Sequence, residues 1–95
     1  MTQKLHSEWS VYLIRTKLNA LYCGCTNDVD RRFAQHQSGK GAKALRGKGP
    51  LVLEWFESGF DKSTAMKLEY FIKQQPKKFK ELLIQGLVSL PEDAA

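Results

Sequence analysis

The sequence contains few cysteines and lacks the four ligands that a structural zinc site needs. Its two cysteines, Cys23 and Cys25, are separated by a single residue. In a β-strand such a pair points both side chains to the same face, a strained geometry for a mutual disulfide. No further cysteine or histidine pair stands at the spacing of a zinc site. We therefore expect two reduced thiols that act as small packing residues, and no structural zinc.

Long apolar runs are also missing. No stretch approaches the roughly 18 consecutive apolar residues that a membrane span requires. Residues 1–7 contain polar and charged positions and no apolar segment of the kind that a secretory signal needs. These absences predict a protein that is not exported, does not contact a membrane and lies in the cytoplasm.

Acidic residues are outnumbered by basic ones. Ten Asp and Glu stand against fifteen Lys and Arg, which gives a formal charge of +5. Such a balance favours a polyanionic partner such as nucleic acid, although a merely soluble basic surface fits it equally well. The 95 residues contain neither a repeat nor a linker. We therefore predict a single domain over residues 1–95, with its core at about 9–86.

The order of predicted elements is strand, strand, helix, strand, helix, helix. Aromatic and β-branched residues at 9–14 and 21–25 predict two antiparallel strands, and an apolar run at 51–56 predicts a buried third one. This order is typical of an α/β (α+β) domain with a small sheet covered by helices.

Helix boundaries follow from capping residues. Asn27 is the predicted N-cap of a helix that ends at residues 38–39. Asp61 is the predicted cap of a second helix, which ends near Gln74. Pro76 suits the first turn of a third helix that ends at Gly86, and a frayed tail is expected after residue 91.

A basic segment separates the first helix from the third strand. Residues 39–50 contain four glycines, four cations and no acidic residue, a pattern typical of a mobile loop. Its cations could contact a phosphate backbone, which would give affinity without sequence preference. The alternative is a solvated loop without a ligand. The cations are Lys40, Lys43, Arg46 and Lys48.

One arginine falls on the apolar face of the first helix. At about 100° per residue, Arg32 shares an arc with Phe33 and His36, whereas Arg31 lies on the far side. A guanidinium at the edge of a core either holds an anion or lays its stem over the core with its head in solvent. Helical phase alone leaves both interpretations open.

A carboxylate repeats this pattern on the second helix. Glu69 shares its arc with Leu68 and Ile72, and it is the charged member of that face. It would bind a metal ion or form an internal salt bridge, for instance with Arg32. Tyrosines in strands are usually packing residues, but a set of five residues together would supply a proton acceptor, a phosphate clamp, a second polar group and a metal ligand. They are Tyr12, Tyr22, Arg32, His36 and Glu69.

These residues carry a resemblance to the GIY-YIG nuclease superfamily. Ser10-Val11-Tyr12, followed ten residues later by the tyrosine of Tyr22-Cys23-Gly24, is similar to the two half-motifs that name it, with Ser10 and Cys23 as substitutions. The family's catalytic arginine stands eight residues after the motif glycine, which here is Arg32. Residues 65–73 resemble the helix that supplies the family's metal-binding glutamate, which maps onto Glu69. The loop at 38–43 and the compact length resemble the small bacterial YhbQ-like proteins.

The resemblance implies a mainly antiparallel three-stranded sheet flanked by helices, and a metal-dependent endonuclease that cuts DNA, favoured over RNA, in repair or processing. Tyr12 would accept a proton from the attacking water, which Tyr22 would orient. Arg32 would stabilise charge on the phosphate, with His36 as a helper. Glu69 would hold a divalent cation, expected to be Mg²⁺. The alternatives are a nucleic-acid-binding module with little activity and a subunit of a repair complex.

Overall fold

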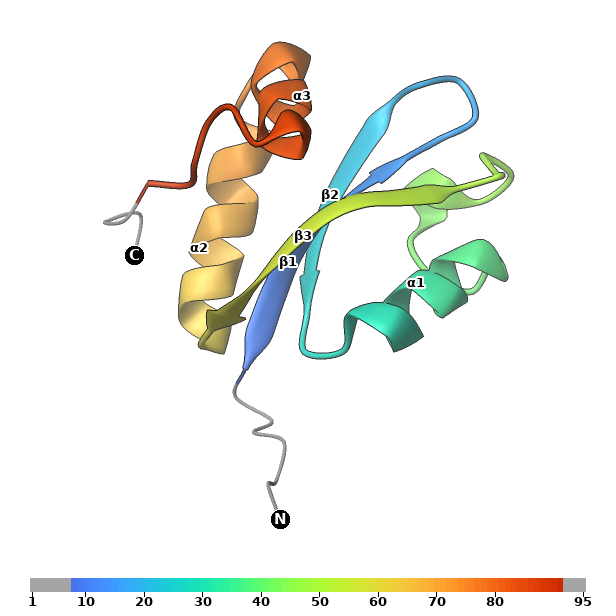
Figure 1. Ribbon diagram of the computed structural model, residues 1–95. Helices are drawn as coiled ribbons and strands as arrows, with labels where there is room; N and C mark the ends of the chain where they lie inside the picture. Colours follow the sequence, from blue (N-terminus) through green and yellow to red (C-terminus); the bar gives the residue numbers. More distant parts are fainter. Residues whose placement is uncertain (1–7, 92–95) are drawn as a thin grey trace.

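The computed structural model describes residues 8–91, which form a three-stranded sheet between helices (Figure 1). The strands are β1 (Trp9–Arg15), β2 (Leu21–Thr26) and β3 (Val52–Phe60). Their order in the sheet is β2-β1-β3, and both pairings are antiparallel. The predicted sheet of three antiparallel strands is therefore confirmed.

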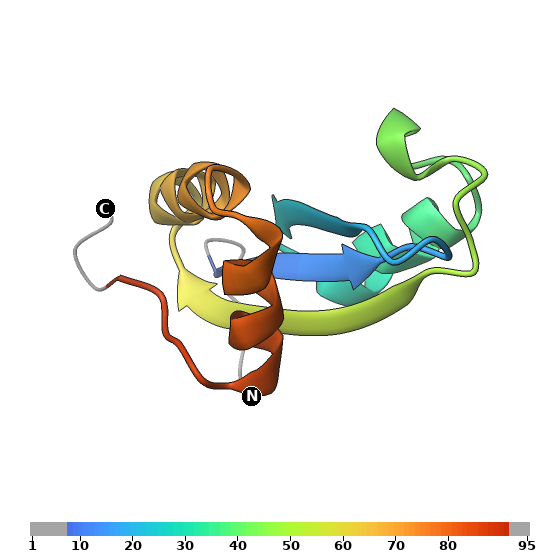
Figure 2. The ribbon, with the colours of Figure 1, turned by 90° about the horizontal axis from the view of Figure 1, so that it is seen from above.

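The helices lie on both faces of this sheet. They are α1 (Val29–Gln37), α2 (Lys62–Lys73) and α3 (Lys77–Gln85), and a short 3₁₀ turn, η1 (Lys43–Leu45), follows α1. The view from above separates α2 and α3 from α1 and η1 (Figure 2). Within residues 8–91, no helix is both long enough and apolar enough to span a membrane.

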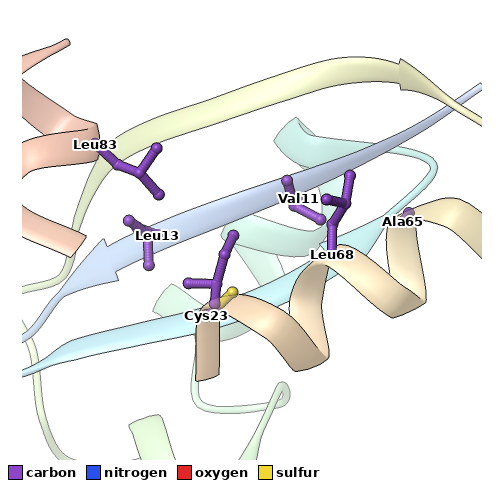
Figure 3. Packing of buried hydrophobic residues seen from close by; sticks show 7 residues of the cluster. Val11, Leu13, Cys23, Ala65, Leu68 and Leu83 are labelled. Atoms are coloured by element: carbon purple, nitrogen blue, oxygen red, sulfur yellow. The ribbon is translucent and has the colours of Figure 1, made fainter. Parts of the chain in front are cut away.

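Alternation along the central strand creates two apolar clusters. Val11 and Leu13 point to the α2 and α3 side, where they meet Cys23 and the buried face of α2 (Figure 3). Tyr12 and Ile14 point to the α1 side. Successive side chains of a strand face opposite ways, so β1 contributes to both cores at once. Cys23 is buried and unpaired, in agreement with the packing role expected of it.

Most predicted helix ends are confirmed, but the first N-cap was wrong by one residue. Asp28, not Asn27, caps α1, since its side chain accepts the backbone N–H of Arg31 at 3.2 Å. Thr26 Oγ1 accepts the N–H of Asp28 at 3.1 Å and turns the chain at that point. Asn27 therefore lies in the turn between β2 and α1, before the helix begins. Asp61 caps α2 as predicted, and α3 lies between Pro76 and the left-handed Gly86.

The third strand differs from its prediction in length and burial. It was expected at 51–56 as a buried strand, yet it continues to Phe60, and Phe56 is 52% exposed. The polar residues 57–59 extend it because Val11 and Ser10 pair with Glu57 and Ser58. β1 occupies the centre of the sheet, so β3 is left at an edge where its outer side meets solvent.

The basic segment is anchored, although its composition predicted a mobile loop. Leu45 of η1 is 2% exposed and packs in the cluster that contains Tyr12 and Ile14. The backbone N–H of Lys17 donates to the carbonyl of Lys48 at 2.9 Å, which ties the segment to the β1–β2 turn. One apolar residue among the glycines and lysines is thus enough to hold it. The expectations for residues 1–7 and for the tail at 92–95 lie outside the described residues.

Candidate active site

Tyr12 lies at the centre of the α1 face of the sheet. It is 3% exposed and pairs with Gly24 across the β1–β2 ladder. A Cβ on Gly24 would collide with the phenol of Tyr12, so this glycine leaves the space in which the ring lies across β2. The glycine of the second half-motif therefore serves the tyrosine of the first.

His36 of α1 holds the hydroxyl of that tyrosine. Its Nε2 lies 2.9 Å from Tyr12 Oη, and its Nδ1 accepts the backbone N–H of Ala42 at 3.2 Å. A backbone N–H can only donate, so Nδ1 is unprotonated and the neutral ring carries its proton on Nε2. His36 therefore donates to Tyr12. Burial lowers the pKa of His36, the charge of Arg32 lowers it further, and both effects favour this neutral form.

Gly41 allows the loop to reach His36. A Cβ at this position would collide with Nδ1 of His36 and would lie 3.0 Å from its Cα. With glycine there, the backbone comes close enough for Ala42 to donate its N–H. Sequence analysis missed the roles of Gly41 and Ala42, because a glycine between lysines carries the ordinary signal of a flexible loop.

Tyr22 also lies against the His36 ring. The ring centroids of Tyr22 and His36 are 5.6 Å apart in a T-shaped arrangement, and those of Tyr12 and His36 are 5.9 Å apart. Aromatic rings favour such edge contacts. The two motif tyrosines thus flank one imidazole, and the structure brings three of the predicted residues together.

Arg32 lies one turn before His36 and is half-buried, whereas Arg31 is exposed, as helical phase predicted. Its Nη1 donates to Gln35 Oε1 at 2.9 Å, a partner that sequence analysis did not identify. Burial raises the pKa of Tyr12 well above its usual value, and Tyr22 adds to this. A hydrogen bond and the positive charge of Arg32 act in the opposite direction. Arg32 is therefore the group that favours ionisation of Tyr12.

Glu69 approaches from α2 on the opposite face, and the suggested ion pair with Arg32 was wrong. Its Oε2 lies 2.7 Å from Nζ of Lys73, one turn along the same helix. That Nζ lies 5.8 Å from the centroid of the Tyr22 ring. Because α1 and α2 cover different faces, a neighbour at i+4 is closer to Glu69 than Arg32 is. The negative charge of Glu69 nevertheless contributes to the raised pKa of Tyr12.

The side chains around Glu69 limit the kind of metal ion that could bind there. Burial, followed by a hydrogen bond to Glu69, raises the pKa of Cys25 to about 12, so its thiol is protonated in this structure. In the part of the chain that the structure describes, no three His, Cys, Asp or Glu side chains form a metal-binding group. One carboxylate suits a hard cation such as Mg²⁺, which keeps several waters and shares its coordination with substrate phosphates.

The four predicted phosphate contacts are exposed. They lie on the segment that carries η1, and this segment touches the site through Ala42. A chain of phosphates at Arg32 could therefore continue across this basic segment. The residues are Lys40, Lys43, Arg46 and Lys48.

Comparisons with known proteins agree with this arrangement. The GIY-YIG catalytic domain matches residues 8–82. A UPF0213 protein of Vibrio campbellii is 68% identical over 85 residues, which cover 90% of this chain and 82% of that protein. A UPF0213 protein of Vibrio cholerae is 58% identical over 90 residues, covering 94% and 89% of the two chains.

A solved structure shares the fold. The solution NMR structure of a UPF0213 protein from Bacillus halodurans is 41% identical, covers 82% of this chain and 83% of its own, and superposes with a TM-score of 0.53. Sequence and structure therefore agree that the chain belongs to the GIY-YIG family and, within it, to the small bacterial UPF0213 proteins.

Proposed function

We propose that this protein is a metal-dependent endonuclease that hydrolyses phosphodiester bonds in DNA. The observation that carries the proposal is the hydrogen-bonded chain from the Ala42 N–H through His36 to the hydroxyl of Tyr12, with Arg32 beside it. A buried phenol with a fixed donor and an adjacent cation is suited to proton transfer at a phosphate. A purely structural buried tyrosine also needs a hydrogen-bond partner, so the cation of Arg32 beside the phenol is what favours a reactive role.

Tyr12 is the proposed acceptor of the proton from the attacking water. Burial disfavours the phenolate, so Tyr12 is a neutral phenol in this structure, and it must release its own proton to solvent before it can accept one from the attacking water. The Nε2–H of His36 can keep its hydrogen bond to the phenolate, and Arg32 stabilises the same charge. Arg32 is also the proposed contact for charge that develops on the phosphate. Tyr22, whose ring also contacts His36, is the proposed group that orients the water.

Glu69 is the proposed ligand of the divalent cation, with Mg²⁺ the expected ion. When bound, such a cation polarises a phosphoryl oxygen and lowers the pKa of nearby groups. Lys73 now neutralises the carboxylate at 2.7 Å, so this lysine has to release Glu69 when an ion binds. Its side chain is 46% exposed, which leaves it free to turn toward solvent.

The test is cleavage of labelled DNA by the purified protein in a Mg²⁺ titration. Substrates should include linear, nicked, flapped and branched duplexes, because the overall basic charge does not distinguish among them. Glu69→Gln and Arg32→Ala should abolish cleavage, whereas Arg31→Ala, the exposed neighbour, should retain it. Equal residual cleavage in all three variants would identify a contaminating nuclease and contradict the proposal.

A nucleic-acid-binding module with little activity is the second candidate. It is favoured by the resting state of the site, where Lys73 neutralises Glu69 and burial keeps Tyr12 protonated. This candidate requires salt-sensitive binding that survives Glu69→Gln, together with no cleavage at any Mg²⁺ concentration. Absence of DNA and RNA binding at low salt would remove it.

A further inference from the structure

An apolar pocket of about 260 Å³ opens beside the candidate site, between the β1–β2 turn and η1. Leu18 and Leu21 line one side and Ala44 and Leu45 the other. Tyr22 also lines it and reaches His36 with its ring, so the pocket and the site share a wall. The volume is below the range of about 300–1,000 Å³ typical of whole drug-sized ligands and suits a single ring system.

The β1–β2 turn holds an apolar side chain in solvent. Leu18 is 83% exposed at its tip. The turn is closed by hydrogen bonds between Thr16 and Ala20 in both directions, at 2.8 and 3.1 Å, and Asn19 adopts a left-handed φ of 72°. A turn with this many internal bonds presents Leu18 in a defined position. A single exposed leucine is ordinary in itself, but this one borders an apolar pocket.

The charges near the pocket indicate what kind of ligand it binds. Residues 9–27 and 31–53, which contain both walls, include no acidic residue, and Lys48 lines the pocket. Glu54 and Glu81, which come near the turn, are both paired with Arg15. A second pocket, at the start of α1, is instead lined by Glu8, Asp28 and Asp30. A polyanion is therefore attracted to the side of η1 and repelled from the start of α1. The occupant must combine an apolar ring with negative charge.

We propose that this pocket binds one unstacked nucleobase of the substrate strand, close to the phosphate at Tyr12 and Arg32. Aromatic and leucine side chains are suited to stacking with a displaced base and to separating it from its neighbour. Lys48 and the adjacent cations would hold the flanking phosphates. A strand with an unpaired nucleotide beside the scissile bond is then preferred over a continuous duplex. This inference rests on the proposed function, because it assumes a nucleic-acid strand at the site.

Binding without divalent cation tests the pocket independently of cleavage. Single-stranded oligonucleotides carry the fluorescent base 2-aminopurine at one position each, and fluorescence and affinity are measured at low salt. The wild type should change the fluorescence strongly at one position. Leu18→Ser should reduce that change and weaken binding by about fivefold or more. Leu87→Ser, at a leucine that is 67% exposed after α3, is the matched control and should bind like the wild type.

Substitution of the responsive nucleotide by an abasic one completes the test. It should weaken binding to the wild type by a similar factor and have little further effect on Leu18→Ser, because both changes empty the same pocket. Equal binding and equal fluorescence in wild type and Leu18→Ser would overturn the inference and leave the nuclease proposal intact. A wild type that binds no single-stranded oligonucleotide at low salt would overturn this inference, whereas the cleavage assay on duplex substrates with Mg²⁺ decides the nuclease proposal separately.

Discussion

The two faces of the sheet bury different kinds of side chain. Toward α2 and α3 the buried cluster is apolar, with Ile72 and Leu68 against the odd-numbered residues of β1. Toward α1 the core contains Tyr12 and His36. The buried polar residues of the described chain belong to this second face or to the turn at its end. They are Ser10, Thr16, Thr26 and His36.

Polar groups on the α1 face are satisfied by specific partners. Ser10 and Ser58 share a hydrogen bond of 2.6 Å, and Thr26 Oγ1 accepts from Asp28. Within residues 8–91 no buried side-chain polar atom lacks a partner. Burial of an unpaired polar group costs about 1–3 kcal/mol, so this face retains its polarity only through fixed geometry. The α2 side is therefore mainly an apolar core that stabilises the fold, with the half-buried Glu69, the proposed metal ligand, on the same helix, whereas the α1 side holds the other proposed reacting groups.

The largest effect is expected from Tyr12→Phe. This change keeps the ring but removes the hydroxyl, so cleavage should fall by about 10²–10⁴-fold, as when a general base is lost. The free energy of unfolding should also fall by about 1–3 kcal/mol, because Nε2 of His36 loses its buried hydrogen-bond partner. Tyr70→Phe, at a tyrosine that is 68% exposed, is the control. A wild-type cleavage rate in Tyr12→Phe would contradict the proposal that the α1 face holds the group that accepts the proton.

The second effect concerns stability alone. Ile72→Ala removes a fully buried side chain of α2 and should lower the free energy of unfolding by about 2–5 kcal/mol. Urea denaturation measures this loss. Cleavage per folded molecule should stay near the wild-type value. Met66→Ala, on the same helix and 52% exposed, should change stability by about 0.5 kcal/mol or less. A loss of cleavage per folded molecule in Ile72→Ala would contradict a role for Ile72 in stability alone.

A moderate effect is expected from Gly41→Ala. The added methyl group would displace the loop from His36 and break its hydrogen bond with Ala42, so cleavage should fall by about tenfold, the cost of one hydrogen bond. Nitrogen chemical shifts of the imidazole would report the lost tautomer preference. Gly49→Ala is the matched control, since a Cβ there meets only an ordinary contact at 3.6 Å. An unchanged histidine spectrum would show that Ala42 does not set the tautomer.

The smallest effect is a dependence of stability on pH. Folding lowers the pKa of His36, so the unfolded chain takes up a proton first as the pH falls. The free energy of unfolding should therefore decrease below about pH 6.5, the usual value for histidine. Denaturation at pH 7.5 and 5 measures the difference, which His36→Gln should reduce. A stability that rises on acidification would contradict the assignment of a neutral His36.

Local signals predicted much of the fold. Asp61 and Gly86 mark helix ends through interactions with their own neighbours, and both are confirmed. Helical phase also placed Arg32 at the edge of a buried face, where its side chain is half-buried. The prediction of Asn27 as the N-cap was wrong because Asn and Asp are about equally favoured at this position. The hydrogen bond between Thr26 and Asp28 determines that Asp28 is the cap. The prediction that β3 is buried was wrong, because an apolar run does not reveal which strand is central.

The amino-acid sequence by itself determined which residues share a face. Alternation in β1 separates Tyr12 from Leu13, and helix periodicity aligns Arg32 with His36. Only the tertiary structure decided that Ala42 donates to His36 and that Glu69 meets Lys73 instead of Arg32. The physical reason is that periodicity orients side chains within one element. Contacts between a loop and a helix, or between helices on opposite faces, depend on how the whole chain packs.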